Sequence, residues 1–220
     1  DQYNNRINAA WPVVKKFNSI TQSSTDGAAS YIHFEGTTKT FWIDVEGFFE
    51  GDFLFYTIAA VSGSITSTDF VNNPTLSGSV TYTPGYQQTA SSLETSRDTS
   101  SESDTYKVQI RTGSVSGPIL GESTTIEIPD PSYTITPSTT TANEGDTITF
   151  NVSGTNIGGG RHYFSTSGTA GGAFSTSDIT PLNGDFTISS NTGSFQVTIL
   201  EDFLTEGTET LSAEVRIGST

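Results

Sequence analysis

Few side chains in this 220-residue chain are of the types that carry out catalysis. His33 and His162 are its two histidines, and cysteine and methionine are absent. A catalytic histidine works beside a nucleophile or a substrate proton, and neither histidine has a nucleophile motif such as Gly-x-Ser-x-Gly nearby. A single histidine within a strand pattern is typical of a packed or exposed side chain. We therefore expect neither histidine to be catalytic.

Carboxylates and a glycine run are the other groups that could do chemistry. Gly158-Gly159-Gly160 is followed by a strand pattern and not by a helix, so it predicts a hairpin turn and not a phosphate-binding loop. The spacing of the 24 Asp and Glu residues leaves open a glycoside-hydrolase carboxylate pair. A thin fold built of Ser and Thr offers no obvious cleft for that reaction, and we expect a non-enzymatic protein.

Composition excludes several classes of partner. The formal net charge is −15, which argues against nucleic acid, because binding a phosphate backbone needs clustered Lys and Arg. An acidic surface fits simple solubility, divalent cations or a salty medium, and charge alone does not separate these. No apolar run approaches the roughly 18 residues of a membrane helix, and the N-terminus lacks a signal-peptide pattern, so we expect no membrane insertion. Without cysteine, no disulfide or thiolate metal site can form.

The sequence contains an internal repeat, and each copy would form the strands that position these residues. Residues 34–41 return as residues 143–150 with Glu, Gly, two Thr and Phe in register, and residues 106–114 return as residues 211–219. The chain has room for two domains of about 100 residues each. We predict one sandwich over residues 28–130 and a second over residues 131–220. Pro129-Asp130-Pro131 marks the boundary, because two prolines stiffen a junction.

Each half alternates apolar and polar residues with the period of a strand. Phe41, Ile43 and Val45 alternate with polar neighbours, and residues 148–152 do the same. Further strands are predicted over residues 54–60, 78–83, 105–112, 124–128, 162–165, 185–189, 194–200 and 210–217. Short strands separated by turn signals predict a β-sandwich in each half.

The two ends depart from the repeat. Residues 2–10 predict a short amphipathic helix ended by Pro12, and the polar stretch that follows predicts a linker, so residues 1–27 form an N-terminal attachment segment and linker. The helix either packs on the first sandwich or anchors the chain to an assembly. The second half lacks a counterpart of residues 124–128. We predict that its last strand is missing and is supplied by a continuation of the chain or by a neighbouring chain.

The acidic turns of the second half resemble a known family. They read Asn-Glu-Gly-Asp-Thr-Ile-Thr-Phe over residues 143–150, Ser-Asp-Ile over residues 177–179 and Glu-Asp-Phe-Leu-Thr-Glu-Gly-Thr-Glu-Thr-Leu over residues 201–211. This resembles the Calx-β domain, an immunoglobulin-like β-sandwich of sodium/calcium exchangers, extracellular-matrix proteins and microbial surface adhesins. The resemblance covers residues 131–220 well and residues 28–130 more weakly. It implies that both sandwiches are immunoglobulin-like, and residues 1–27 are outside it. We therefore expect an all-β chain of two tandem immunoglobulin-like sandwiches, preceded by the short N-terminal helical segment that the residue spacing predicts.

Calcium-binding members of that family hold the ion with acidic residues at one end of the sandwich. The matching positions in the second half are Glu144, Asp178, Glu201, Asp202 and Glu206. Ca²⁺ takes about six to eight oxygen ligands, so the resemblance implies a Ca²⁺ site here, with solvated loop acids as the alternative. The first half keeps Glu35 and Asp69, but its other acids, Asp98, Glu102 and Asp104, lie in a rearranged loop. We expect no calcium in the first half.

A second resemblance concerns the Ser-, Thr- and Gly-rich segments. Residues 106–114, 123–128 and 133–137 resemble tandem repeats of structural proteins from tailed phages of marine cyanobacteria, and residues 2–7 resemble the N-terminal segment of such proteins. The resemblance implies a virion structural protein from a tail fibre, a baseplate or a head decoration. Its localisation would be the virion, with the extracellular space or a bacterial cell surface as the alternative.

Three functions follow as hypotheses. The first is a structural spacer or host-contact rod that meets other assembly proteins through residues 1–27, as a homo-oligomer or as part of a larger assembly. The second is a calcium-dependent surface adhesin repeat. The third is a carbohydrate-binding module, in which exposed aromatic residues such as Trp42 and Tyr86 stack on a host glycan; covering the edges of the core is their alternative role.

Overall fold

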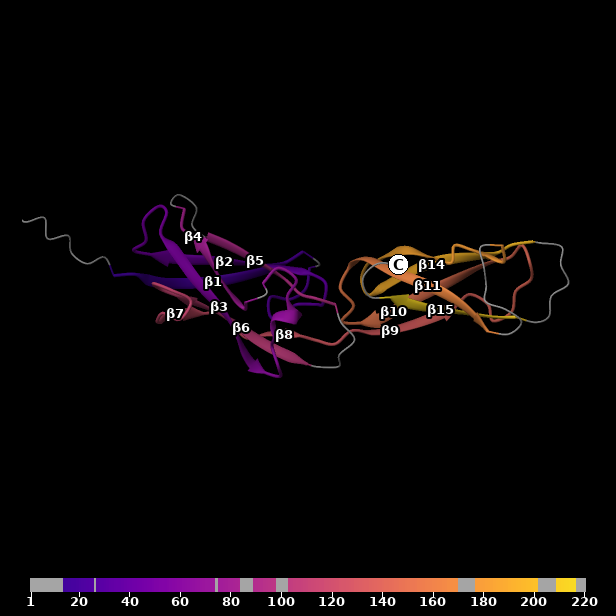
Figure 1. Cartoon of the computed structure of the whole chain (residues 1–220), viewed down its shortest axis with the longest axis horizontal. Coiled ribbons are helices and arrows are strands. Elements are labelled where there is room, and N and C mark those ends of the chain that lie inside the picture. The colour runs from indigo at the N-terminus through magenta and orange to yellow at the C-terminus, as the bar shows by residue number, and fades with distance from the viewer. Residues whose placement is uncertain are drawn as a thin grey trace, which may run out of the picture.

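The computed structural model describes residues 14–25, 27–73, 75–83, 89–97, 103–169, 177–201 and 209–216. In this part of the chain the fold is all-β, as predicted, apart from one turn of 3-10 helix, η1 (Ser67–Asp69). Two groups of strands lie end to end (Figure 1). None of the described segments forms a helix that is long and apolar enough to cross a membrane. The predicted helix over residues 2–10 lies outside the described residues.

The first domain is a sandwich of two antiparallel sheets. Its strands are β1 (Lys16–Ser24), β2 (Thr38–Glu46), β3 (Phe53–Ser62), β4 (Ser77–Thr81), β5 (Thr89–Glu94), β6 (Asp104–Arg111), β7 (Ile119–Glu122) and β8 (Ile126–Ile128). One sheet has the order β1-β2-β5, and the other has the order β4-β3-β6-β7. The short strand β8 also pairs with β6, beside its N-terminal half.

The second domain repeats this arrangement. Its strands are β9 (Ser132–Pro137), β10 (Thr147–Thr155), β11 (Gly160–Thr169), β12 (Ile179–Thr180), β13 (Asn183–Ile188), β14 (Thr192–Ile199) and β15 (Thr210–Arg216). One sheet has the order β12-β14-β10-β9, and the other has the order β13-β11-β15. The strands β9, β10, β11, β13, β14 and β15 take the places of β1, β2, β3, β4, β5 and β6. The sequence repeat is therefore also a repeat of topology.

Each domain has its own hydrophobic core, formed by the inward residues of the alternating strands. Phe41, Ile43 and Val45 on β2 are buried, as the sequence pattern predicts. In the second domain, Phe150 on β10 and Phe195 on β14 stack with a centroid distance of 5.2 Å, and Phe164 stacks on Phe195 at 4.0 Å. The two core clusters share no residue, so each sandwich buries its apolar side chains separately.

The linker prediction is wrong for residues 16–24, because these residues form strand β1. The strand pairs along its length with β2, and its half-buried Phe17 and Ile20 pack against the first core. Its remaining residues are mostly Ser, Thr, Asn and Gln, so the segment lacks the apolar alternation of a strand with one buried face. Pairing with a neighbour, and not its own hydrophobicity, makes this segment a strand.

The glycine run at residues 158–160 is not a hairpin turn, which corrects a second prediction. The preceding strand β10 pairs with β9 and β14, whereas β11 pairs with β13 and β15, so the run connects the two sheets. A Cβ on Gly158 would lie 2.7 Å from Cγ2 of Thr37 in the first domain. The missing side chain therefore lets the two domains come into contact.

Two hydrogen bonds also join the domains. Nδ2 of Asn156 donates to the carbonyl oxygen of Asp130 in the proline junction at 3.0 Å, and Nη1 of Arg97 donates to the carbonyl oxygen of Arg161 at 3.3 Å. Pro129 and Gly158 are both buried. These contacts hold the domains in a defined arrangement across a small area.

Candidate functional site

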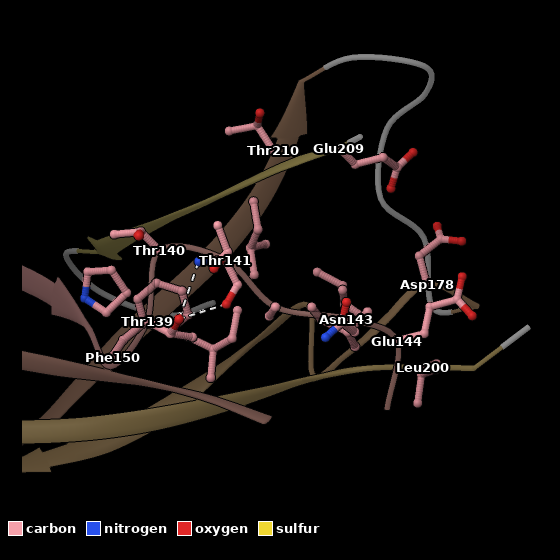
Figure 2. Close-up of a pocket in the computed structure, with 16 residues that line it drawn as sticks. Thr139, Thr140, Thr141, Asn143, Glu144, Phe150, Asp178, Leu200, Glu209 and Thr210 are labelled. Carbon is pink, nitrogen blue, oxygen red and sulfur yellow. Dashed lines mark hydrogen bonds between the residues drawn. The ribbon is translucent and has the colours of Figure 1, made fainter. Parts of the chain in front are cut away.

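The cavity of the second domain lies between its two sheets and has a volume of about 620 Å³. Its floor consists of core residues, and its walls come from the loop before β10 and from the start of β15. Figure 2 shows the side chains that line it. The lining includes Thr140, Ala142, Ile148, Phe150, Ile179 and Leu211. Half of the sixteen lining residues are apolar and half are polar or charged, so the cavity combines an apolar floor that suits a hydrophobic side chain with a polar surround.

The mouth of the cavity is acidic, and Glu144 lies in the turn that leads into β10. The next residue, Gly145, has a φ of +84°, and its N–H donates to the carbonyl oxygen of Ile199 at 2.9 Å. A Cβ on Gly145 would lie 3.0 Å from Oε1 of Glu201. The positive φ therefore requires glycine, and the close approach places the carboxylate of Glu201 beside the turn that carries Glu144.

Asp178 reaches the same end of the domain through strand β12. Its carbonyl oxygen accepts a hydrogen bond of 2.8 Å from the N–H of Leu200, and the next residue, Ile179, pairs with Ile199 of β14. Asp178 and Glu144 both line the cavity, and Figure 2 shows both carboxylates at its mouth. Glu209, which the sequence analysis does not single out, also lines this cavity. The sequence motif Glu-Gly-Thr-Glu contains it, but the motif alone does not set it apart from Glu206.

Three of the five predicted calcium ligands, Glu144, Asp178 and Glu201, thus lie at one end of the second sandwich. Asp202 and Glu206 lie outside the described residues. Within the described segments, no three His, Asp or Glu side chains are close enough together to hold a metal ion. Three carboxylates carry six oxygens, so they would reach the lower limit of the six to eight that Ca²⁺ takes only if all three bound in a bidentate way. The calcium site therefore stays a prediction.

The acidic residues of the first domain have local structural roles. Asp69 caps η1, where its Oδ2 accepts a hydrogen bond of 2.5 Å from the N–H of Thr66. Asp104 is buried, and its Oδ1 accepts a hydrogen bond of 2.8 Å from the N–H of Ser64. Asp98 and Glu102 lie outside the described residues. Both described carboxylates thus hold the backbone of nearby loops.

Both histidines are packed inside the fold. Nδ1 of His33 lies 2.7 Å from the hydroxyl of Tyr106, and its Nε2 lies 3.1 Å from the carbonyl oxygen of Thr37. Burial raises the pKa of Tyr106 well above its usual value. His162 lies 3.2 Å from the hydroxyl of Tyr133, and burial, together with the charge of Arg97, lowers its pKa. Their ring nitrogens are therefore occupied by structural contacts.

The first domain contains a buried lysine whose burial no sequence pattern predicts. Lys39 is fully buried on β2, and its Nζ donates to the carbonyl oxygens of Ala29 at 3.4 Å and Ser30 at 3.3 Å. Its counterpart in the second domain is Ile148, in the floor of the cavity. Lysine at an inward position of an alternating strand is unusual, because a buried charge needs compensating contacts.

Of the two aromatic residues proposed for glycan stacking, the structure describes one, Trp42, which is exposed. Trp42 is 40% exposed on β2, and its Nε1 donates to Oγ of Ser23 at 3.4 Å. Tyr86 lies outside the described residues. Trp42 thus presents part of its ring to solvent while its polar atom is satisfied by the neighbouring strand.

The fold and this site define an all-β protein of tandem immunoglobulin-like sandwiches. No family model matches the chain, and no curated protein matches it. Among solved structures, the chain is similar to the crystal structure of CBD12 from CALX1.2, with 15% sequence identity and a TM-score of 0.36. That match covers 86% of this chain and 78% of the other chain. At this level the likeness carries no conclusion about activity.

Proposed function

We propose that this chain is a non-enzymatic structural protein whose two sandwiches form a spacer or host-contact rod. The observation that carries the proposal is the end-to-end placement of two domains with separate cores (Figure 1). Such an array extends a chain in one direction, because each unit contacts only its neighbour. The buried Pro129 and Gly158 support a rod with limited bending, since both lie where the domains meet.

The resemblance to repeats of tailed cyanobacterial phages supports a virion as the setting, in a tail fibre, a baseplate or a head decoration. The structural contacts of His33 and His162 fit a protein without catalytic chemistry. Partners would be other assembly proteins that meet residues 1–27, and a host-surface glycan or protein. The strongest test is to quantify this chain on purified particles. A fixed copy number per particle supports the proposal, and absence from the particles contradicts it.

A calcium-dependent surface adhesin is the second candidate, and the placement of Glu144, Asp178 and Glu201 at one end favours it. An ion that binds only the folded second domain stabilises it by about 2.7 kcal/mol at a concentration one hundred times its Kd. The test compares thermal unfolding in CaCl₂ and in a chelator for the parent chain and for the double variant Glu144→Gln and Asp178→Asn. Glu50→Gln, at an exposed acid of the first domain, is the matched control.

A calcium-dependent rise in Tm that the double variant loses and the control keeps would establish the adhesin type of site. A Tm that does not respond to calcium or chelator would remove this candidate and leave the spacer. For the carbohydrate-binding alternative, Trp42→Ala should abolish binding to a glycan array, and an array without any signal would contradict that role.

A further inference from the structure

Strand β15 has an open edge. In the described residues it pairs with β11 on one side only. Its inward residues Leu211, Ala213 and Val215 are half-buried, whereas the corresponding residues Tyr106, Val108 and Ile110 of β6 are fully buried. Unpaired N–H and C=O groups along a strand edge can accept another strand. An added strand would therefore bury Leu211, Ala213 and Val215 further.

The first domain shows what fills this position. There β8 pairs antiparallel with β6, and on its other side it meets the loop before β2. The N–H of His33 donates to the carbonyl oxygen of Glu127 at 2.8 Å, and the N–H of Glu127 donates to the carbonyl oxygen of Tyr31 at 2.8 Å. A short strand is thus held between a loop and the edge strand, and its Ile126 and Ile128 enter the core.

The cavity of the second domain occupies the equivalent position. By the sequence repeat, Thr140 and Ala142 correspond to Tyr31 and His33, and Leu211 corresponds to Tyr106. All three line the cavity, Thr140 and Ala142 from the loop before β10 and Leu211 from β15. Figure 2 labels Thr140 among the lining side chains. No strand pairs with this loop in the described part of the chain. We call this cavity and the outer edge of β15 the strand slot.

We propose that the strand slot binds residues 3–11 of a second copy of this chain as a β-strand, antiparallel to β15, so that copies join head to tail. The bound segment would repeat the contacts of β8. Its apolar residues would enter the cavity, and its backbone would pair with β15 and with the loop at residues 140–142. A surface patch that accepts a different patch of the next copy gives an open chain and not a closed dimer.

The sequence of the segment fits this role. The odd positions from Ile7 to Trp11 are apolar, whereas Asn5 interrupts the row that Tyr3 begins. The even positions between them are Asn4, Arg6, Asn8 and Ala10. As a strand, the segment would present an apolar face over residues 7–11 and a mainly polar opposite face. Strand addition uses this pattern, in which main-chain bonds give affinity and alternate side chains fill pockets. The alternation competes with the helical spacing of the same residues, and the slot would favour the strand.

The connection of the two domains provides the geometric precedent. In the chain itself, β8 lies just before a proline junction that leads into β9, the first strand of the next domain. Residues 3–11 likewise lie just before Pro12 and β1, the first strand of the first domain. A copy that donates this segment would therefore place its first domain beyond the slot, as the second domain lies beyond β8. Strand β1 begins at the end of the molecule remote from the second domain, which disfavours self-insertion (Figure 1).

The first test measures association of the full chain by sedimentation velocity over a range of concentrations. The parent should form a ladder of oligomers, and Ile7→Asp should weaken association at least tenfold, because it puts a charge into the apolar slot. Asn8→Asp, on the opposite face, adds the same charge and should leave association within twofold. A synthetic peptide of residues 1–13 should shorten the oligomers, and the same peptide with Ile7→Asp should not. A monomer at every concentration, or oligomers that ignore Ile7→Asp, would overturn the proposal.

The second test uses the absence of cysteine in the parent chain for disulfide trapping. Asn8→Cys in one copy and Ser212→Cys in another place a thiol on the donated segment and on the exposed face of β15. Mixing and mild oxidation should give a disulfide-linked dimer of the two variants. Asn8→Cys with Ser79→Cys, an exposed position on β4, should give none. Equal cross-linking in both mixtures, or none in either, would mean that a different strand fills the slot or that it stays empty, and would reject head-to-tail joining.

Discussion

Among the described residues, the first domain pairs both edges of strand β6, whereas in the second domain one edge of the equivalent strand β15 is paired. Strands β6 and β15 have equivalent neighbours on one side, β3 and β11, and in the part of the chain that the structure describes β7 and β8 cover the other side of β6 while no strand pairs with that side of β15. The difference extends to the interior, where a hydrogen-bonded His33 and Tyr106 correspond to Ala142 and Leu211. Two copies of one topology can thus differ in completeness while keeping the same sheets. A repeat supplies the fold, and the closing strand decides whether a domain is self-contained.

The largest expected effect comes from truncating the closing strand of the first domain. Ile126→Ala should lower its free energy of unfolding by about 2–5 kcal/mol, because Ile126 is fully buried. Leu211→Ala in the second domain, made in the Ile7→Asp background so that the slot stays empty, should cost about 1–2 kcal/mol, since its side chain is half-buried. Urea unfolding is followed by fluorescence for the first domain, because both tryptophans precede residue 131, and by NMR for the second. Equal losses would show that the two edges are equally covered.

The next effect concerns the polar pair that the second domain lacks. Tyr106→Phe removes the hydroxyl that is 2.7 Å from Nδ1 of His33 and leaves a buried ring nitrogen without that partner. The first domain should lose about 1–3 kcal/mol of stability. Urea unfolding followed by tryptophan fluorescence measures the loss. Tyr82→Phe, at a half-buried tyrosine of the same domain, is the control. An unchanged urea midpoint would mean that the hydrogen bond between Tyr106 and His33 adds nothing to stability beyond the packing of the two rings.

A smaller effect should make the stability of the second domain depend on pH through His162. Burial and the charge of Arg97 hold the pKa of His162 below its ordinary value, so the unfolded chain binds this proton more readily than the folded chain. The second domain should therefore have this contribution in full above about pH 6.5 and lose it as the pH falls from 6.5 through the lower pKa of the folded state. NMR titration of His162 measures the pKa, and Arg97→Gln should raise it. A pKa at or above the ordinary value in the parent chain would contradict the assignment.

The smallest effect should appear at the contact between the domains. A Cβ on Gly158 would lie 2.7 Å from Cγ2 of Thr37, whereas a Cβ on Gly159 would meet nothing closer than 3.7 Å. Gly158→Ala should widen the distribution of interdomain angles with a change in stability of about 1 kcal/mol or less, and Gly159→Ala should leave the angles unchanged. Small-angle scattering of both variants measures this difference. Identical scattering curves would indicate that Gly158 does not limit the approach of the domains.

The parts of the fold that sequence could predict were those with strong local signals. Alternation on β2 and β10 marked the cores, and the repeat of Glu-Gly-x-Thr-x-Thr-Phe marked the two domains. Strand β1 was missed because its partner and not its own composition makes it a strand. Glu144 and Asp178 line the same cavity, while the calcium site that the resemblance implies stays a prediction, and the buried Lys39 could not be foreseen. Its burial depends on carbonyl groups of a loop whose path no local pattern reveals.

The parallel contact between Ile32 and Glu127 has a mechanical consequence. Tension applied to the two ends of the first domain enters near β1 and leaves near β8, so the hydrogen bonds of Tyr31 and His33 to Glu127 are loaded together in shear. Bonds loaded together resist a pulling force better than bonds that peel apart one at a time. With its slot empty, the second domain has no such clamp in its described residues and should yield first under load. Filling the slot would add a clamp of the same kind to the second domain.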